Sequence, residues 1–173
     1  MTEQLSLDPG KTVILIEDYQ NRQLSGFTDE YREGLLKRAN TVLDKARGAG
    51  IPVFYVEVRR GERTPESEIH SAILPKPGEP VFTKSRVGPF STTNLDEELR
   101  GKGIETLVVM GIATSGCVLS TVRWAADIGY RQVVVSDCCA DRDEEVNRVL
   151  LEKVIPRQAT VVTSEELFEA LNL

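Results

Sequence analysis

Three chemical groups that could share one reaction each follow or end a different apolar run of the chain: an acid in the pair Glu17-Asp18, the amine of Lys84 and the thiol of Cys117. A thiolate is a nucleophile, a carboxylate can accept its proton, and an ammonium group can stabilise the negative charge and orient the carboxylate. In an open sheet of parallel strands, ligands bind at the carboxyl ends of the strands. If the apolar runs form such a sheet, the three side chains could meet at one edge and attack a carbonyl carbon.

Cys117 stands where the apolar run 106–111 passes through small residues into a helical pattern. At the first turn of a helix, free backbone N–H groups and the helix dipole favour an anion, which lowers the pKa of a thiol. The same N–H groups could hold an oxyanion. A nucleophilic Cys117 is therefore expected to be accessible and ionised near neutral pH. Lone cysteines are often small buried core residues, so this stretch alone leaves both roles open.

Six apolar runs predict the strands that would position these residues. They are rich in Val and Ile, and most of them do not alternate with polar residues, which is typical of strands that are buried on both faces in a parallel sheet. The runs cover residues 12–16, 51–58, 80–84, 106–111, 132–136 and 159–163, of which 80–84 is the weakest.

Helical patterns lie between the strands. Apolar side chains recur at spacings of three to five in residues 31–50, 94–103, 118–129 and 146–156, and Gly or Pro residues end each pattern. Asn94 and Glu97 have the spacing of a capping box. Alternating strands and helices predict one three-layer αβα domain over residues 1–173, with a central, mostly parallel six-stranded sheet. The charged, proline-containing segment 59–80 is expected to be a long surface loop.

Composition limits the classes of function. A net charge of −6 argues against a nucleic-acid surface, which needs a basic patch. No apolar run approaches the length of a membrane span, and the N-terminus shows no secretory signal. Three cysteines, two of them adjacent, form a poor disulfide framework, so a reducing cytoplasm is the expected location.

The segments that contain these residues resemble the isochorismatase-like cysteine hydrolases. The matching segments are DYQN (18–21), VFTKSRVGPFSTTNLDEELRGKGIETLVV (81–109), GIATSGCVLSTVRWAADIGY (111–130) and VVVSDCCADRDEEV (133–146). Each segment alone is a weak signal, but the order and spacing of the segments match the family pattern over nearly the whole chain. The resemblance implies a Rossmann-like fold in which Asp18, Lys84 and Cys117 form a catalytic triad. It also implies a cis peptide bond at Ile112–Ala113, beside the N–H groups that hold the oxyanion.

The acid position departs from the family pattern, because the chain offers the pair Glu17-Asp18 where one acid is typical. Counting back from Gln20-Asn21 selects Asp18. Side chains alternate along a strand, so the two carboxyls are expected on opposite sides. Glu17 is therefore expected to be a surface or interface charge.

Other polar residues have simpler interpretations. Nicotinamidases in the same superfamily bind a metal through an Asp and two His residues, but His70 is the single histidine here, so we expect no metal and no cofactor. The adjacent Cys138 and Cys139 could be redox-active, although packing at a strand end is favoured. Three acids in the same region are expected to cap and solvate a loop. These acids are Asp137, Asp141 and Asp143.

The leading hypothesis is a cofactor-free hydrolase that cleaves an amide-type C–N bond of a small molecule. Tyr19, Arg86 and Phe90, with Trp124, could line the substrate pocket or pack against another subunit. The resemblance implies a homo-oligomer, a dimer or tetramer. One alternative is isochorismatase-type hydrolysis of a vinyl ether with Asp18 as general acid, and another is a non-catalytic binding protein with the same fold.

Overall fold

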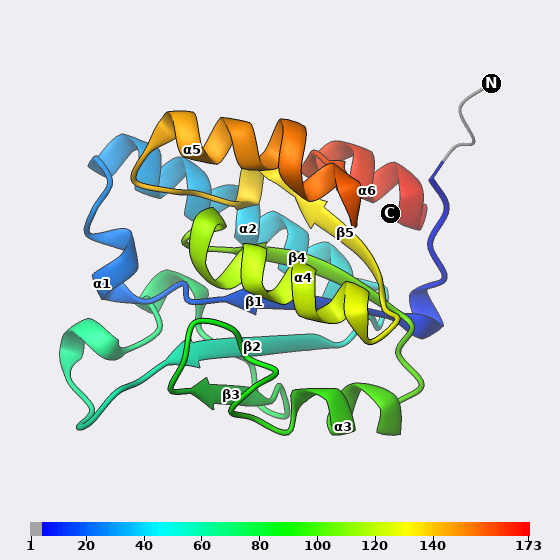
Figure 1. Ribbon diagram of the computed structural model, residues 1–173, viewed down its shortest axis with the longest axis horizontal. Helices are drawn as coiled ribbons and strands as arrows, with labels where there is room; N and C mark the ends of the chain where they lie inside the picture. The colour runs from blue at the N-terminus through cyan, green and yellow to red at the C-terminus, as the bar shows by residue number, and fades with distance from the viewer. Residues whose placement is uncertain (1–4) are drawn as a thin grey trace.

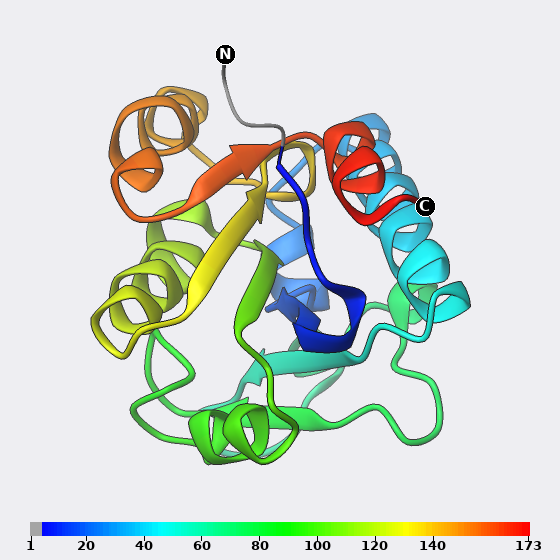
Figure 2. The ribbon, with the colours of Figure 1, turned by 90° about the vertical axis from the view of Figure 1, so that its right-hand side faces the viewer.

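The computed structural model describes residues 5–173 and contains one six-stranded sheet between two layers of helices (Figures 1 and 2). The strands are β1 (Thr12–Glu17), β2 (Val53–Val58), β3 (Val81–Lys84), β4 (Thr106–Gly111), β5 (Arg131–Val135) and β6 (Thr160–Val162). All neighbouring strands pair in parallel, so the predicted α/β class and all six predicted strands are confirmed.

The strand order is β3-β2-β1-β4-β5-β6. The chain progresses from β1 toward one edge of the sheet, then crosses to β4 and progresses toward the other. This reversal between β1 and β4 leaves a crevice at their carboxyl ends, where open α/β sheets bind ligands. The residues that follow β1 and β4 include Asp18 and Cys117.

Each face of the sheet is covered by helices. α2 (Asp29–Gly48) and α6 (Ser164–Leu171) cover one face, and α3 (Leu95–Gly101), α4 (Leu119–Asp127) and α5 (Glu144–Val149) cover the other (Figure 2). The short α1 (Asn21–Leu24) follows β1. Residues of β1 alternate between the two cores: Ile14 and Ile16 face the α2 side, and Val13 and Leu15 face the α4 side. This alternation is what two-sided burial of a strand requires.

The four predicted helical patterns are present, but the structure differs from the prediction at one helix cap and contains one additional helix. Asn94 precedes α3 but makes no side-chain capping bond; instead, Thr93 Oγ1 accepts a hydrogen bond from the Leu95 N–H at 3.2 Å. The C-terminal helix α6 was not predicted. Its sequence signal is the capping box formed by Thr163 and Glu166, which satisfies backbone donors at the helix start.

The 59–80 segment contains two short 3₁₀ turns, Pro65–Ser67 and Ser71–Ile73, and is tied to the end of β1. The Gln20 side chain donates to the Val58 and Ser67 carbonyls and accepts from the Val58 N–H. The predicted surface loop is therefore fastened over the carboxyl edge of the sheet, where it forms part of a cavity wall. Among the described residues, no helix combines the length and apolar character that a membrane span requires.

Candidate active site

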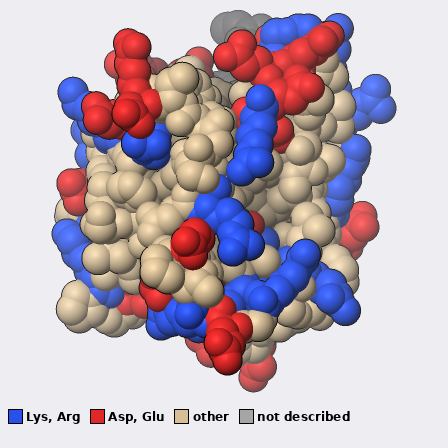
Figure 3. Space-filling model, turned by 90° about the vertical axis from the view of Figure 1, so that its left-hand side faces the viewer, with Lys and Arg blue, Asp and Glu red and all other residues tan. Residues whose placement is uncertain are grey.

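Asp18, Lys84 and Cys117 all line one cavity of about 580 Å³ at the carboxyl edge of the sheet. Asp18 follows β1, Lys84 ends β3, and Cys117 lies in a π-helical turn, Thr114–Val118, between β4 and α4. Residues that are far apart in sequence therefore reach one cavity because parallel strands end at a common edge. Figure 3 views this face of the molecule.

The carboxylate and the ammonium group form a buried ion pair. Lys84 Nζ lies 2.7 Å from Asp18 Oδ2 and also donates to the Val87 carbonyl at 2.6 Å. Lys84 is 1% exposed and Asp18 is 5% exposed. Taking either charge out of water alone would cost several kcal/mol, so each group requires the other. The pair holds the carboxylate in a fixed place beside the cavity.

Asp18 leaves the strand in an unusual backbone conformation, with φ of 57°. Its N–H still bonds to the Val56 carbonyl at 2.9 Å, and its carbonyl accepts from the Gln20 N–H at 2.7 Å. Asp tolerates this left-handed region better than most residues because its short polar side chain bonds locally, although the conformation still costs about 1 kcal/mol. The turn directs Asp18 toward Lys84 instead of continuing the strand alternation.

Burial raises the pKa of Asp18 to about 6, against the lowering effect of Lys84 and of the nearby Cys117 thiol. A carboxyl with this pKa is ionised above pH 6 yet still basic enough to accept a proton near neutral pH. Asp18 therefore has the protonation behaviour of a general base.

Cys117 differs from the expected accessible thiolate. It is 2% exposed, and its Sγ donates to the Ile112 carbonyl at 3.3 Å. Burial raises the pKa of Cys117 well above its usual range, and the charges of Asp18 and Glu17 raise it further. The helix start does not overcome these effects, because the thiol faces the core between the sheet and α4. The resting group is a thiol, so ionisation has to be coupled to proton transfer.

The peptide bond Ile112–Ala113 is cis, as the family resemblance implied. Three N–H groups after it are already occupied: those of Thr114, Ser115 and Gly116 bond to the Ala140 carbonyl, Asp141 Oδ2 and the Ala113 carbonyl. The Ala113 N–H has no hydrogen-bond partner among residues 5–173, and Ala113 lines the cavity. The Ala113 N–H is therefore the candidate donor to a carbonyl oxygen placed near Cys117.

Glu17 is not the surface or interface charge that the sequence suggested. It is fully buried on the α4 side of the sheet, where Thr121 Oγ1 donates to its Oε1 at 2.6 Å. Space for the side chain comes from Gly111, where an added Cβ would lie 3.0 Å from the Glu17 Cβ. The expectation that the two carboxyls lie on opposite sides is wrong, because strand alternation directs Glu17 to the side of the thiol and the left-handed turn brings Asp18 there as well.

The buried Glu17 carboxyl lacks a full set of partners: its Oε2 has no hydrogen-bond partner among the described residues. Burial, which outweighs the hydrogen bond from Thr121, raises the pKa of Glu17 to about 8. At neutral pH this side chain is therefore a neutral acid, and the negative charge of the site is carried by Asp18.

We expect Glu17→Gln to change the pH dependence of stability. The folded pKa of about 8 exceeds the usual 4.5, so the folded protein holds an extra proton between these values. Its unfolding free energy therefore falls as pH rises, by up to about 1.4 kcal/mol per pH unit from this group. The glutamine amide in the variant does not titrate, so it causes no such fall in the unfolding free energy. Urea unfolding at pH 5 and pH 8.5 should show the variant gaining stability relative to the wild type at the higher pH.

Asp18 is present in both proteins, so its own titration cancels to first order in this comparison. An identical difference between variant and wild type at the two pH values would contradict the buried, neutral state of Glu17.

The three predicted pocket residues lie in different places. Arg86 lines the cavity that contains Cys117. Tyr19 does not: it is buried on the α2 side, because it follows the turn at Asp18, and its hydroxyl donates to the Cys138 carbonyl at 2.6 Å. Phe90 lines a second cavity, which it shares with Arg86 and Trp124.

Cys138 and Cys139 are both buried and face opposite cores, in agreement with the predicted packing role. Of the three nearby acids, Asp143 caps the helix that follows, as predicted, whereas Asp137 and Asp141 bind other segments. Asp137 accepts from the Ser164 N–H and hydroxyl, Asp143 accepts from two N–H groups at the start of α5, and Asp141 accepts from the Ser115 N–H. The Asp141 contact was not foreseen, and it fastens the turn that carries Cys117.

His70 Nδ1 accepts a hydrogen bond from the Ala72 N–H at 3.2 Å, as the cap of a 3₁₀ turn. Within residues 5–173 there is no group of three or more His, Cys, Asp or Glu side chains arranged to hold a metal ion.

Two supporting residues were missed by sequence reasoning. Thr121 is a polar residue on the buried face of α4, three residues after Val118 and four before Ala125, and this pattern could have pointed to a buried polar partner. Gln20 is recognisable in the DYQN segment, but its function of tying the 59–80 loop to β1 depends on a tertiary contact that no local pattern contains.

Comparison with known proteins identifies the family. The isochorismatase domain model matches residues 12–166. The chain is 30% identical to a probable isochorismatase of Pseudomonas chlororaphis, over 95% of this chain and 88% of that protein. It is 28% identical to a ureidoacrylate amidohydrolase of Agrobacterium fabrum, over 78% of each protein.

Solved structures agree with this result. An isochorismatase family protein from Burkholderia thailandensis superposes with a TM-score of 0.87 and 25% identity, over 99% of this chain and 100% of that one. N-carbamoylsarcosine amidase from Thermoplasma acidophilum superposes with a TM-score of 0.79 and 28% identity, over 90% of this chain and 97% of that one. From these similarities over nearly its whole length, the chain belongs to the isochorismatase family of hydrolases.

Proposed function

We propose that the protein hydrolyses the C–N bond of a small amide or carbamoyl compound through an acyl-enzyme on Cys117. The observation that carries the proposal is the buried Asp18–Lys84 pair on the wall of the same cavity as the Cys117 thiol. Relatives named as ureidoacrylate amidohydrolase and N-carbamoylsarcosine amidase support amide chemistry in particular.

In the acylation step, Asp18 accepts the thiol proton as Cys117 Sγ attacks the substrate carbonyl carbon. The Ala113 N–H donates to the developing oxyanion. As the tetrahedral intermediate collapses, the C–N bond breaks and protonated Asp18 gives its proton to the leaving nitrogen. Amine or ammonia departs, and the acyl group stays on sulfur.

In the deacylation step, Asp18 accepts a proton from a water molecule that attacks the thioester carbonyl. The C–S bond then breaks, the acid product leaves, and the proton returns to Cys117. Lys84 remains paired with Asp18 at 2.7 Å when the carboxylate is ionised. This contact orients the carboxylate and stabilises its negative charge where both side chains are buried.

The direct test is a panel of small amides, carbamoyl compounds and isochorismate, followed by mass spectrometry of the protein during turnover. We expect ammonia or amine release and an added acyl mass on Cys117, with Cys138 and Cys139 unmodified. Turnover of isochorismate without any adduct would instead support the vinyl-ether reaction.

Activity is expected to survive removal of metal ions. The proposed steps use a thiol, a carboxylate and an ammonium group, and a chain with one histidine cannot supply the two-histidine metal site of nicotinamidases. Turnover should therefore be equal before and after dialysis against EDTA. Activity that is lost on dialysis and returns with added zinc or iron would contradict this mechanism.

Homo-oligomeric assembly and a cytoplasmic location remain predictions from the sequence and the resemblance.

A further inference from the structure

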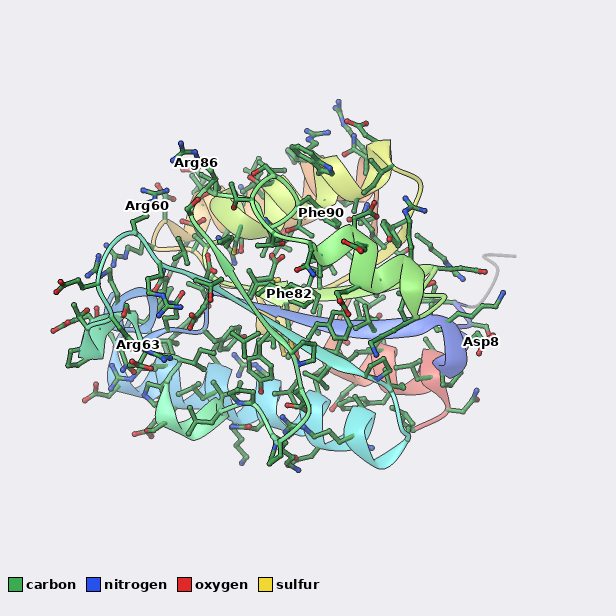
Figure 4. The ribbon with its side chains drawn as sticks, turned by 90° about the horizontal axis from the view of Figure 1, so that it is seen from below. Asp8, Arg60, Arg63, Phe82, Arg86 and Phe90 are labelled. Atoms are coloured by element: carbon green, nitrogen blue, oxygen red, sulfur yellow. The ribbon has the colours of Figure 1, made fainter. Side chains whose placement is uncertain are left out.

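The Glu17 carboxyl has no part in the steps proposed above, although it lies on the same side of the sheet as the nucleophile. It is 0% exposed, in a core built mainly from apolar side chains. Two members of this core, Phe82 and Phe90, lie inside the molecule, whereas the charged side chains of Arg60 and Arg86 lie at its edge (Figure 4). A carboxyl buried in such a core costs stability unless its polar atoms are satisfied. Glu17 is therefore a candidate for a functional role.

The two carboxyls beside Cys117 have the same pattern of partners. Each has one oxygen with a partner and one buried oxygen that has none within residues 5–173. Lys84 Nζ contacts Asp18 Oδ2 at 2.7 Å, and Thr121 Oγ1 donates to Glu17 Oε1 at 2.6 Å. The oxygens left without a partner are therefore Asp18 Oδ1 and Glu17 Oε2.

The partners of the two carboxyls differ in charge, and this difference sets the protonation of each carboxyl. Lys84 is a cation, so it stabilises an ionised Asp18. Thr121 is a neutral donor that cannot balance a charge, and burial raises the pKa of Glu17 to about 8. At neutral pH Asp18 Oδ1 is therefore a proton acceptor. Glu17 Oε2 carries a proton, because Oε1 already accepts from the Thr121 hydroxyl.

The Cys117 thiol interacts with both of these carboxyls. Its hydrogen points to the Ile112 carbonyl, to which Sγ donates at 3.3 Å. The sulfur keeps electron pairs that can accept a hydrogen bond. The protonated Glu17 Oε2 is a buried donor without an acceptor, and the sulfur is an acceptor beside it.

We propose that Glu17 donates a hydrogen bond from Oε2 to Cys117 Sγ and thereby stabilises the thiolate that forms during attack. The inference rests on the proposed function, because it takes Cys117 as the nucleophile. As attack begins, the S–H bond breaks and the proton moves to Asp18 Oδ1, while Glu17 keeps its own proton. A hydrogen bond to a thiolate is stronger than one to a thiol, so the contact favours the charged form. An ionised Glu17 would instead repel the thiolate.

Glu17→Met and Glu17→Gln distinguish a hydrogen-bond donor from a side chain that only fills space. Methionine is close to glutamate in size but has no donor. The amide of glutamine can accept from Thr121 through its oxygen and donate to sulfur through its nitrogen. The rate constant for modification of Cys117 by iodoacetamide is measured at pH 7 by mass spectrometry, which requires no substrate.

We expect Glu17→Met to lower this rate constant by roughly tenfold or more, because a hydrogen bond to a charged group is lost. Glu17→Gln should retain most of the wild-type rate constant. Thermal unfolding of each variant shows that the modified protein is folded. A rate constant for folded Glu17→Met at or above that of the wild type would overturn the proposed donor and leave the nucleophile in place.

Infrared spectroscopy tests the hydrogen bond without any reaction at Cys117. A protonated carboxyl has a C=O band separate from the bands of carboxylates, and the band moves to higher frequency when the O–H group loses its acceptor. We expect the difference spectrum of wild type and Glu17→Gln at pH 7 to contain such a band. Cys117→Ala should shift it to higher frequency. A missing band, or a band that Cys117→Ala leaves unchanged, would overturn the proposal.

Cys139→Ala is the matched control, since Cys139 is a second buried thiol on the same side of the sheet and close enough to sense the charge of Glu17. It should leave the band in place. A shift with Cys139→Ala and none with Cys117→Ala would assign the donor to the other sulfur and overturn the proposal. If iodoacetamide modifies Cys117 in none of the proteins but Cys117→Ala shifts the band, the hydrogen bond stands and the proposed nucleophile is overturned.

Discussion

Cys117→Ser is expected to keep the fold and to lose amide hydrolysis by roughly 10⁴-fold or more. A serine hydroxyl occupies slightly less space than the thiol and can donate to the same Ile112 carbonyl. It is much harder to ionise than a thiol, and this site already raises the pKa of the thiol through burial and two nearby carboxyls. The variant and wild type are compared by kcat/KM on a compound that the wild type consumes.

The fold of the variant is checked by circular dichroism and thermal unfolding, so that lost activity is separated from lost structure. Mass spectrometry should show the acyl adduct in the wild type and none in the variant. Undiminished turnover by Cys117→Ser would reject the acyl-enzyme and favour the vinyl-ether reaction, in which Asp18 acts as a general acid.

Much of the fold could be predicted because its signals are local. The apolar runs are long enough to indicate strands buried on both faces, and most of the helices between them have clear apolar stripes and glycine ends. Parallel strands with crossover helices place the strand ends at one edge, so the meeting of Asp18, Lys84 and Cys117 at one cavity followed from topology.

The chemistry of the site was harder to predict because it depends on one backbone turn and on burial. The regular alternation of side chains along β1 correctly places Glu17 and Ile16 on opposite faces of the sheet. It fails at Asp18, where φ is 57°. The burial of Glu17 depends on Gly111 and Thr121, which come from β4 and α4. The protonated thiol follows from burial first and from the two nearby carboxyls second, and a helix-start argument includes neither effect.

Asp18→Asn is expected to lower kcat/KM by roughly 10³-fold or more, because an amide cannot accept the thiol proton. In the wild type, kcat/KM should fall below about pH 6, the pKa to which burial raises Asp18. Protonation of the Asp18 carboxyl removes the base, so the fall in kcat/KM at low pH follows the titration of Asp18. Activity of both proteins is measured from pH 5 to pH 8 on the same substrate.

Glu17→Gln is the matched control, since it makes the same carboxyl-to-amide change at the neighbouring residue. Glu17 is neutral at pH 7 with a pKa of about 8, so its amide should keep most of the activity. Asp18→Asn also leaves the Lys84 ammonium group buried without its carboxylate partner, so its thermal unfolding must be measured to show that the assayed protein is folded.

If folded Asp18→Asn stayed active and Glu17→Gln were inactive, Glu17, which lies on the α4 side with Cys117, would be the base. Both carboxyls raise the pKa of the thiol, but only Asp18 is paired with Lys84, and this pairing keeps Asp18 ionised and ready to accept a proton at neutral pH.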